Sequence, residues 1–184
     1  APGRPVDAGG GIVVRFMRTN ARSYMDKTAA RRAKKAGTGN LDRILSSAAR
    51  LFTSRGFHGT STRDIAEAAG VSLGNIYNYF DTKEAVFVSL LESREKEYFR
   101  PDQPLIKALS STSFPDNIEE LGFASRETVS RFSEYILLIY VDVVEFEARH
   151  VNKMFARMRQ GYAAALKASP PCRARIAADI DPVG

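Results

Sequence analysis

The sequence contains no tryptophan, only two histidines and a single cysteine, Cys172. One cysteine excludes a disulfide within the chain and is consistent with a reducing compartment. The longest purely apolar run, residues 135–141, is too short to cross a bilayer. Residues 9–17 lack the apolar core and the cleavage site of a signal peptide. We therefore expect a cytoplasmic protein without a membrane partner.

Signals for β-strands are weak throughout, whereas apolar residues recur at helical spacing over much of the chain. We therefore predict an all-α protein. Catalytic patterns are also missing, because the sequence has no glycine-rich phosphate loop, no activated nucleophile and no carboxylate pair beside a strand. An enzyme is thus the least favoured class of function, and we predict no cofactor.

Acidic residues are scarce at the start of the chain. The first 40 residues hold nine Lys or Arg against two Asp, whereas the remainder has eighteen basic and nineteen acidic residues. The net charge of +6 therefore belongs to this segment, and we predict a flexible basic arm over residues 1–39. Beside a DNA-binding helix, such an arm would add phosphate contacts that weaken with salt. A solvated tail without a partner is the alternative that the sequence leaves open.

Two short helices joined by a glycine turn are the main feature of the first half of the sequence. Ser61 is placed to cap the first helix by accepting a hydrogen bond from the N–H of Asp64, and Gly70 can end it in the left-handed conformation. Ser72 is placed to cap the second helix, which we predict over residues 73–80. Helices joined this tightly cross at a steep angle, which is the geometry of a helix-turn-helix motif.

The second of these helices has an unusual outer face. Ile76 and Phe80 are spaced to point inward, with Leu73 near the edge of the same side. The outward positions carry Ser72, Gly74, Asn75, Tyr77 and Asn78. Hydroxyls, amides, an aromatic ring and a glycine suit contact with base edges and phosphates, whereas a solvated helix normally carries Glu or Lys there. The alternative is a buried connecting helix of an all-α enzyme or helical bundle.

The same region resembles the amino-terminal signature of the tetracycline-repressor (TetR) family of bacterial transcription regulators. The resemblance spans residues 41–95 and rests on Gly56-Phe57, Thr60 to Ala66, Ala69 to Ser72, Gly74 to Tyr77, Tyr79-Phe80 and Lys83-Glu84. Tyr79 stands where histidine is most frequent in the family. The resemblance implies a three-helix DNA-binding domain, expected here over residues 40–83, with double-stranded DNA as its partner.

The expected DNA contacts follow from placing the second short helix in the major groove. They are Thr62, Arg63, Ser72, Leu73, Gly74, Asn75, Tyr77, Asn78 and Lys83. Tyr77 offers a ring for thymine methyl groups and a hydroxyl for phosphate, and Gly74 permits close approach. Thr62 and Arg63 at the start of one helix, and Lys83 at the start of the next, are expected to hold the DNA backbone.

Two longer helices are expected to flank the motif. Asn40 is placed to cap the first, which Gly56 ends, and a capping box from Asp81 to Glu84 begins a connecting helix over residues 82–100. The predicted inward residues are Leu41, Ile44, Leu45, Ala48, Leu51 and Phe52 in the first, and Ala85, Phe87, Val88, Leu91 and Tyr98 in the second.

The remainder, residues 84–184, is expected to be a helical regulatory domain. We predict a short helix over residues 105–109 and one long helix over residues 127–168. The resemblance implies that this region binds an unidentified small-molecule effector and forms a homodimer. The candidate pocket residues are Phe132, Ile136, Tyr140, Val144 and His150, with plain core packing as the alternative. Two further helices usual in the family have no counterpart after residue 168, so we expect the domain to be incomplete at its C-terminus.

Four residues near the middle of the predicted long helix invite a metal site, namely Asp142, Glu145, Glu147 and His150. On a single helix Glu145 and Glu147 point about 200° apart, so the four side chains cannot converge. We therefore predict no metal site, and we expect Glu145 or His150 to provide a polar anchor for the effector pocket.

Together these features predict a sequence-specific DNA-binding repressor that binds a palindromic operator as a dimer and is released by a small molecule. Two alternatives remain: a small-molecule-binding helical protein, and a regulator without an effector that keeps the same DNA-binding head. An activator is a further alternative that the sequence leaves open.

Overall fold

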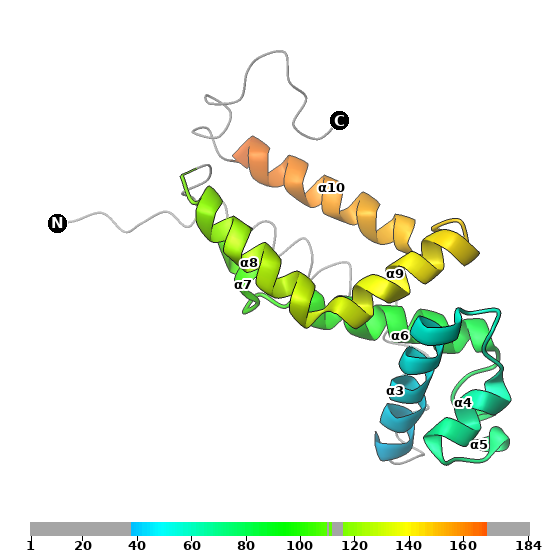
Figure 1. Ribbon diagram of the computed structural model, residues 1–184. Coiled ribbons are helices and arrows are strands. Elements are labelled where there is room, and N and C mark those ends of the chain that lie inside the picture. The colour runs from blue at the N-terminus through cyan, green and yellow to red at the C-terminus, as the bar shows by residue number, and fades with distance from the viewer. Residues whose placement is uncertain (1–37, 110, 112–115, 169–184) are drawn as a thin grey trace. The chain divides into compact units, whose positions relative to one another are not determined.

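A computed structural model describes residues 38–109, 111 and 116–168 of the 184-residue chain (Figure 1). The regular structure in these segments is entirely helical, which confirms the predicted all-α class. The helices are α3 (Thr38–Arg55), α4 (Thr62–Ala69), α5 (Leu73–Tyr77), α6 (Lys83–Tyr98), α7 (Pro104–Leu109), α8 (Ile118–Arg131), α9 (Ser133–Glu145) and α10 (Val151–Ala168). Residues 1–37 of the predicted arm, and Cys172, lie outside the described residues.

The chain divides into two compact units. The first, called here the head unit, comprises residues 38–98 and 132–152 among the described residues, and therefore holds α3, α4, α5, α6 and α9. The second unit holds α7, α8 and α10 from Lys153 onward. The connecting helix and α9 thus share one compact unit with the helix-turn-helix. The domain boundary expected near residue 83 remains a prediction.

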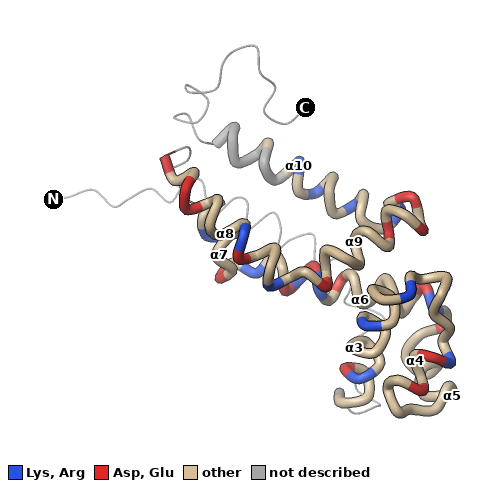
Figure 2. Tube along the Cα trace, in the orientation of Figure 1, with Lys and Arg blue, Asp and Glu red and all other residues tan. Residues whose placement is uncertain are grey.

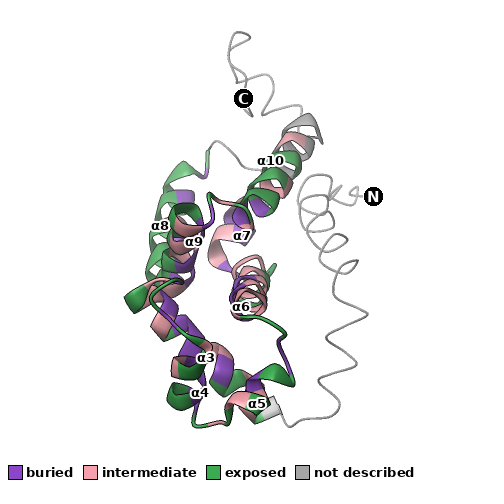
Figure 3. Cartoon of the chain, turned by 90° about the vertical axis from the view of Figure 1, so that its right-hand side faces the viewer, coloured by how far each residue is buried: buried purple, intermediate pink, exposed green. Residues whose placement is uncertain are grey.

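The core of the head unit forms where α3 packs against α4, α6 and α9. Ile44 and Phe52 of α3 and Phe87 of α6 are completely buried. Figure 3 shows the buried residues of α3 and α6 in purple. Phe57 folds back into this core after the chain turns at Gly56 with a φ of 75°. Asn40 does not cap α3, because the helix begins at Thr38. A residue with a capping side chain can equally lie inside the first turn when the preceding residues adopt helical dihedral angles.

The N-terminus of α6 is capped one residue later than predicted. The Thr82 hydroxyl accepts a hydrogen bond of 3.0 Å from the N–H of Ala85, so Thr82 takes the role expected of Asp81. The buried residues of α6 are Val86, Phe87, Leu90 and Leu91, whereas Ala85, Val88 and Tyr98 are half-buried. This helix packs against α3 and against α9, so its inner face is wider than the single stripe that the sequence predicted.

The prediction of one continuous helix over residues 127–168 is wrong. Phe132 leaves the helical conformation between α8 and α9, with φ −106° and ψ 25°. A second break follows α9, where Glu147 and Ala148 have positive φ angles of 55° and 59°. The buried Asp142 carboxylate accepts hydrogen bonds from the backbone N–H groups that begin α10 and so stabilises this break. Apolar residues continue at helical spacing across both breaks, which explains why the sequence pattern does not show them.

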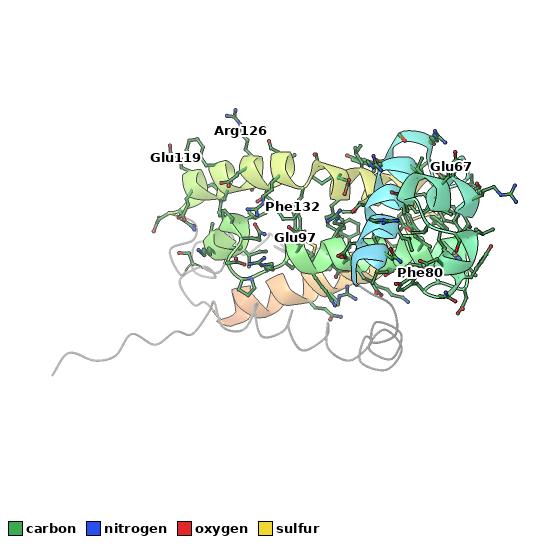
Figure 4. The ribbon with its side chains drawn as sticks, turned by 90° about the horizontal axis from the view of Figure 1, so that it is seen from below. Glu67, Phe80, Glu97, Glu119, Arg126 and Phe132 are labelled. Carbon is green, nitrogen blue, oxygen red and sulfur yellow. The ribbon has the colours of Figure 1, made fainter. Side chains whose placement is uncertain are left out.

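The second unit is built around the packing of α7 on α8. Ala108, Leu121 and Ala124 form its buried cluster, and the amide of Asn117 donates a 3.0 Å hydrogen bond to the carbonyl of Ala108. The exposed side of α8 carries charged residues, such as Glu119 and Arg126 labelled in Figure 4, together with the exposed apolar residues Ile118, Phe123 and Val129. None of the described helices combines the length and the apolar character required to cross a membrane.

Candidate nucleic-acid interface

Helix α4 begins with a complete capping box. The Ser61 hydroxyl accepts a 3.1 Å hydrogen bond from the N–H of Asp64, and the N–H of Ser61 donates a 2.7 Å bond to the Asp64 carboxylate. Hydrogen bonds from the Ser61 side chain and then from its backbone lower the pKa of Asp64, so this carboxylate is ionised at the positive end of the helix. The predicted cap at Ser61 is therefore confirmed.

The turn after α4 is held by an arginine that the sequence did not predict. Gly70 has a φ of 61°, the left-handed conformation that was expected there. Arg43 of α3 donates hydrogen bonds of 2.9 Å and 2.7 Å to the carbonyls of Ala69 and Gly70. No sequence signal could have identified this contact, because the partners lie 26 and 27 residues apart and depend on how α3 packs against α4.

Helix α5 is shorter than predicted. It ends at Tyr77, and the N–H groups of Tyr79 and Phe80 both bond to the carbonyl of Ile76 in a tightened last turn. The chain turns here because both aromatic rings enter the core: Tyr79 and Phe80 are 8% and 7% exposed. The predicted inward pair of Ile76 and Phe80 is nevertheless confirmed, since both residues are buried.

Helix α5 contains no Lys, Arg, Asp or Glu (Figure 2), and its outer face is polar. Ser72, Gly74, Tyr77 and Asn78 are exposed, and Tyr77 exposes 51% of its surface. The Ser72 hydroxyl caps the helix by accepting a 3.1 Å bond from the N–H of Asn75, as predicted. A Cβ atom at Gly74 would meet only the Ser72 hydroxyl, at 4.0 Å, so no contact within the protein requires glycine at this position.

Two of the expected contact residues on α5 are less accessible than predicted. Leu73 is half-buried, and Asn75 is half-buried with its side-chain oxygen buried and without a hydrogen-bond partner. On a helix of one and a half turns the inner side occupies more of the circumference than the sequence pattern suggested.

At the start of α4, Thr62 is half-buried and Arg63 is exposed. Glu67, labelled in Figure 4, lies on the exposed side of the same helix.

Lys83, which is predicted to hold the DNA backbone, forms hydrogen bonds within the protein. Its ammonium group donates hydrogen bonds of 2.8 Å and 2.7 Å to the carbonyls of Phe57 and Thr60. It also lies 4.2 Å from the centroid of the Phe57 ring, a cation–π contact. Two of its three N–H donors therefore hold the segment between α3 and α4, which the sequence could not show because the partners are remote in the chain.

The five residues expected to line an effector pocket have different surroundings. Phe132 (Figure 4) is buried with its ring 5.2 Å from that of Tyr98, and Ile136 is half-buried. Tyr140 and Val144 are 62% and 77% exposed.

The His150 ring is held by two carboxylates. Its Nδ1 atom lies 2.5 Å from Asp142, and its Nε2 atom lies 3.2 Å from Glu84 of α6. His150 and Asp142 join α9 to α10, and Glu145 contacts the segment before α4. The role of either residue as a pocket anchor stays a prediction. Within the described segments, no three His, Cys, Asp or Glu side chains are arranged to hold a metal ion.

The family model and the two relatives that follow are all described as regulatory proteins. Residues 44–90 match the family model described as "Bacterial regulatory proteins, tetR family". Over 108 residues the chain is 32% identical to the HTH-type transcriptional repressor KstR2 of Rhodococcus jostii (strain RHA1). This match covers 59% of this chain and 52% of KstR2. Over 65 residues it is 43% identical to the HTH-type transcriptional regulator RutR of Escherichia coli (strain K12), covering 35% of this chain and 30% of that one.

A solved structure shares the fold over a longer span. The crystal structure of "Probable transcriptional regulatory protein RHA5900" matches 77% of this chain and 76% of that chain, with a TM-score of 0.51 and 23% sequence identity. At this level of identity the likeness concerns the fold alone. The chain spans about half the length of KstR2. The residues that match the family model, 44–90, include the whole of α4 and α5.

Proposed function

Because this chain belongs to the TetR family of bacterial DNA-binding regulators, we propose that it acts as a transcriptional regulator and not as an enzyme. KstR2 is named a repressor, and we extend repression to this chain. Its place of action is the cytoplasm, where bacterial DNA lies. The observation that carries the proposal is the outer face of α5, a capped helix whose exposed residues include hydrogen-bonding side chains and no charge.

We propose that two copies of the chain bind a palindromic operator. Each α5 would enter a major groove, and the two grooves would be about one helical turn, or 34 Å, apart. Ser72, Tyr77 and Asn78 are exposed and can form hydrogen bonds with base edges or phosphates, while Gly74 lets the backbone approach. Arg63 is exposed at the start of α4, where a cation and free backbone N–H groups favour a phosphate.

Release by a small molecule is the second part of the proposal, and it rests on the family resemblance. The effector would bind within residues 84–184 and change the separation of the two DNA-binding heads. Since Tyr140 and Val144 are exposed and His150 is paired, Phe132 and Ile136 are the better candidates for its wall.

The test is to sequence the DNA fragments that the purified protein selects from a random pool. We expect one enriched palindrome, and Tyr77→Ala should weaken binding to it at least about tenfold, because a base contact contributes about 1–3 kcal/mol. The melting temperature should not change, since half of the Tyr77 surface is exposed.

Tyr140→Ala is the matched control. It truncates another tyrosine of the head unit, one that is 62% exposed on α9, and should leave operator binding unchanged. A pool without an enriched sequence would overturn the proposed function. An operator bound equally well by Tyr77→Ala would overturn the placement of α5.

A further inference from the structure

The segment between α3 and α4, residues 56–61, is bonded to the end of a helix far along the chain. The Glu145 carboxylate, at the last residue of α9, accepts hydrogen bonds of 2.8 Å and 2.7 Å from the backbone N–H groups of Phe57 and His58. The same carboxylate lies 2.6 Å from Nδ1 of the His58 ring. These contacts span 87 and 88 residues of sequence and lie within the head unit. We call residues 56–61 the α3–α4 loop.

The opposite side of the α3–α4 loop is held by α6. Lys83, the first residue of α6, donates to the carbonyls of Phe57 and Thr60. Between the two anchors the Phe57 ring is enclosed by Phe146, with ring centroids 4.5 Å apart, and by Phe87, at 5.6 Å. The backbone N–H groups of Phe57 and His58 therefore tie the loop to α9, and the carbonyls of Phe57 and Thr60 tie it to α6.

The contact with Glu145 also explains the glycine that begins the loop. Gly56 has a φ of 75°, and a Cβ atom built on it would lie 2.4 Å from Oε1 of Glu145. The carboxylate can approach the loop this closely only because position 56 has no side chain. Burial raises the pKa of Glu145, but the hydrogen bonds from His58 and Phe57 outweigh it and lower the pKa, so the group is ionised at neutral pH.

The loop leads directly into the proposed DNA-binding surface. Its last residue, Ser61, is the cap of α4, and the next two residues are Thr62 and Arg63. Helix α4 in turn packs against α5. A shift of the loop would therefore move the start of α4 and the outer face of α5 together.

We propose that Glu145 is a positioning residue for DNA binding. It holds the α3–α4 loop through the Phe57 and His58 N–H groups, and thereby fixes the orientation of α4 and α5 relative to α9. The inference rests on the proposed function. It adds that a displacement of α9 would change the affinity for the operator through the contact between Glu145 and the α3–α4 loop.

The head unit offers a matched control on the same helix. Glu134 of α9 also forms an ion pair within the unit, with Arg94 of α6 at 2.9 Å, but it lies one residue from the start of α9 and has no contact with the α3–α4 loop. Glu145→Gln and Glu134→Gln therefore remove the same charge from the same helix. Only the first substitution removes an acceptor from the loop.

The test compares these variants on the selected operator and on a duplex of random sequence. We expect Glu145→Gln to bind the operator about tenfold more weakly, the equivalent of one hydrogen bond to a charged group, with little change on the random duplex. Glu134→Gln should match the wild type on both. Glu145→Asp, which keeps the charge but shortens the reach, should give an intermediate loss.

A second measurement does not require DNA. Amide hydrogen exchange should be faster at Phe57, at His58 and in the first turn of α4 in Glu145→Gln, and unchanged in Glu134→Gln. If the wild type selects no operator, the proposed function fails, and the exchange data still decide whether Glu145 positions α4. Unchanged exchange, unchanged operator affinity, or an equal loss on both duplexes would each overturn the inference.

Discussion

Lys83 illustrates how much the role of one side chain depends on its partners. As the first residue of a helix beside a DNA-reading motif, a lysine is well placed to bind phosphate. Its ammonium group instead bonds to two carbonyls of the α3–α4 loop and lies over the Phe57 ring. Two of its three donors are thus used inside the head unit, and the exposed Arg63 is the better candidate for a phosphate contact.

Replacing Lys83 and Arg63 by methionine separates these roles. We expect Lys83→Met to lower the free energy of unfolding by about 2 kcal/mol, because it removes two charge-assisted hydrogen bonds, and to leave the salt dependence of DNA binding unchanged. Arg63→Met should leave stability unchanged and reduce the slope of log affinity against log salt by about 1. Urea unfolding and fluorescence anisotropy at several salt concentrations measure the two effects. A reduced salt slope for Lys83→Met with normal stability would restore the phosphate clamp.

Helix α5 shows how an element too short to be stable alone is held in place. A five-residue helix has almost no intrinsic stability in water, since nucleation costs more than one turn returns. Its N-terminus is capped by Ser72, and Ile76 anchors it in the core. Arg43 fixes the turn that precedes it. Apart from Ser72, the outer face can therefore be polar, because Ile76 in the core and Arg43 on the preceding turn hold α5 in place.

Two glycines near α5 test this separation of fold and surface. Gly74→Ala should leave the free energy of unfolding unchanged or raise it by up to about 1 kcal/mol, because alanine favours a helix and the Cβ atom has room. It should nevertheless weaken operator binding, since it enlarges the face that approaches DNA. Gly70→Ala should lower stability by about 1–2 kcal/mol, because the residue has a φ of 61°. Thermal unfolding and anisotropy measure both; unimpaired binding by Gly74→Ala would argue against close approach at this position.

Across the whole molecule, the ionised carboxylates connect stability to pH. Asp64 and Glu145 in the head unit, and Asp102 in the second unit, all have pKa values below their usual 3.8, 4.5 and 3.8. Hydrogen bonds from Ser61 lower the pKa of Asp64, those from His58 and Phe57 lower that of Glu145 against the effect of burial, and those from Arg100 lower that of Asp102. A carboxylate whose pKa is lowered by folding stabilises the native state above its usual pKa, and this stabilisation disappears as the pH falls through the lowered value.

We therefore expect the melting temperature to be constant above pH 5 as far as these groups are concerned, and to fall on acidification below about 4.5. Glu145→Gln should start from a lower melting temperature at neutral pH and lose less of it, because its link to the α3–α4 loop no longer titrates. Calorimetry between pH 3 and pH 7 measures the difference. A wild type that becomes more stable on acidification would contradict the sign of these shifts.

Most of the DNA-binding motif could be predicted because its signals are local. Ser61 and Ser72 cap helices through N–H groups three residues away, and Gly70 ends a helix through its own dihedral angles. The same locality explains the failures. Thr82 caps α6 in place of the predicted Asp81. Helix α5 ends earlier than predicted because Tyr79 and Phe80 turn into the core, which the local pattern does not describe.

The sequence by itself determined the helical class, the helix-turn-helix and its uncharged outer face, since these depend on residues within one or two turns of each other. Tertiary structure decided what joins that motif to the rest of the head unit: Arg43 on the turn, Lys83 and Glu145 on the α3–α4 loop, and the breaks on either side of α9. The contacts of Arg43, Lys83 and Glu145 join groups that are 23 or more residues apart in the sequence. The breaks beside α9 interrupt helices whose apolar pattern continues unchanged. Only the packing of the helices brings such donors and acceptors within hydrogen-bond distance.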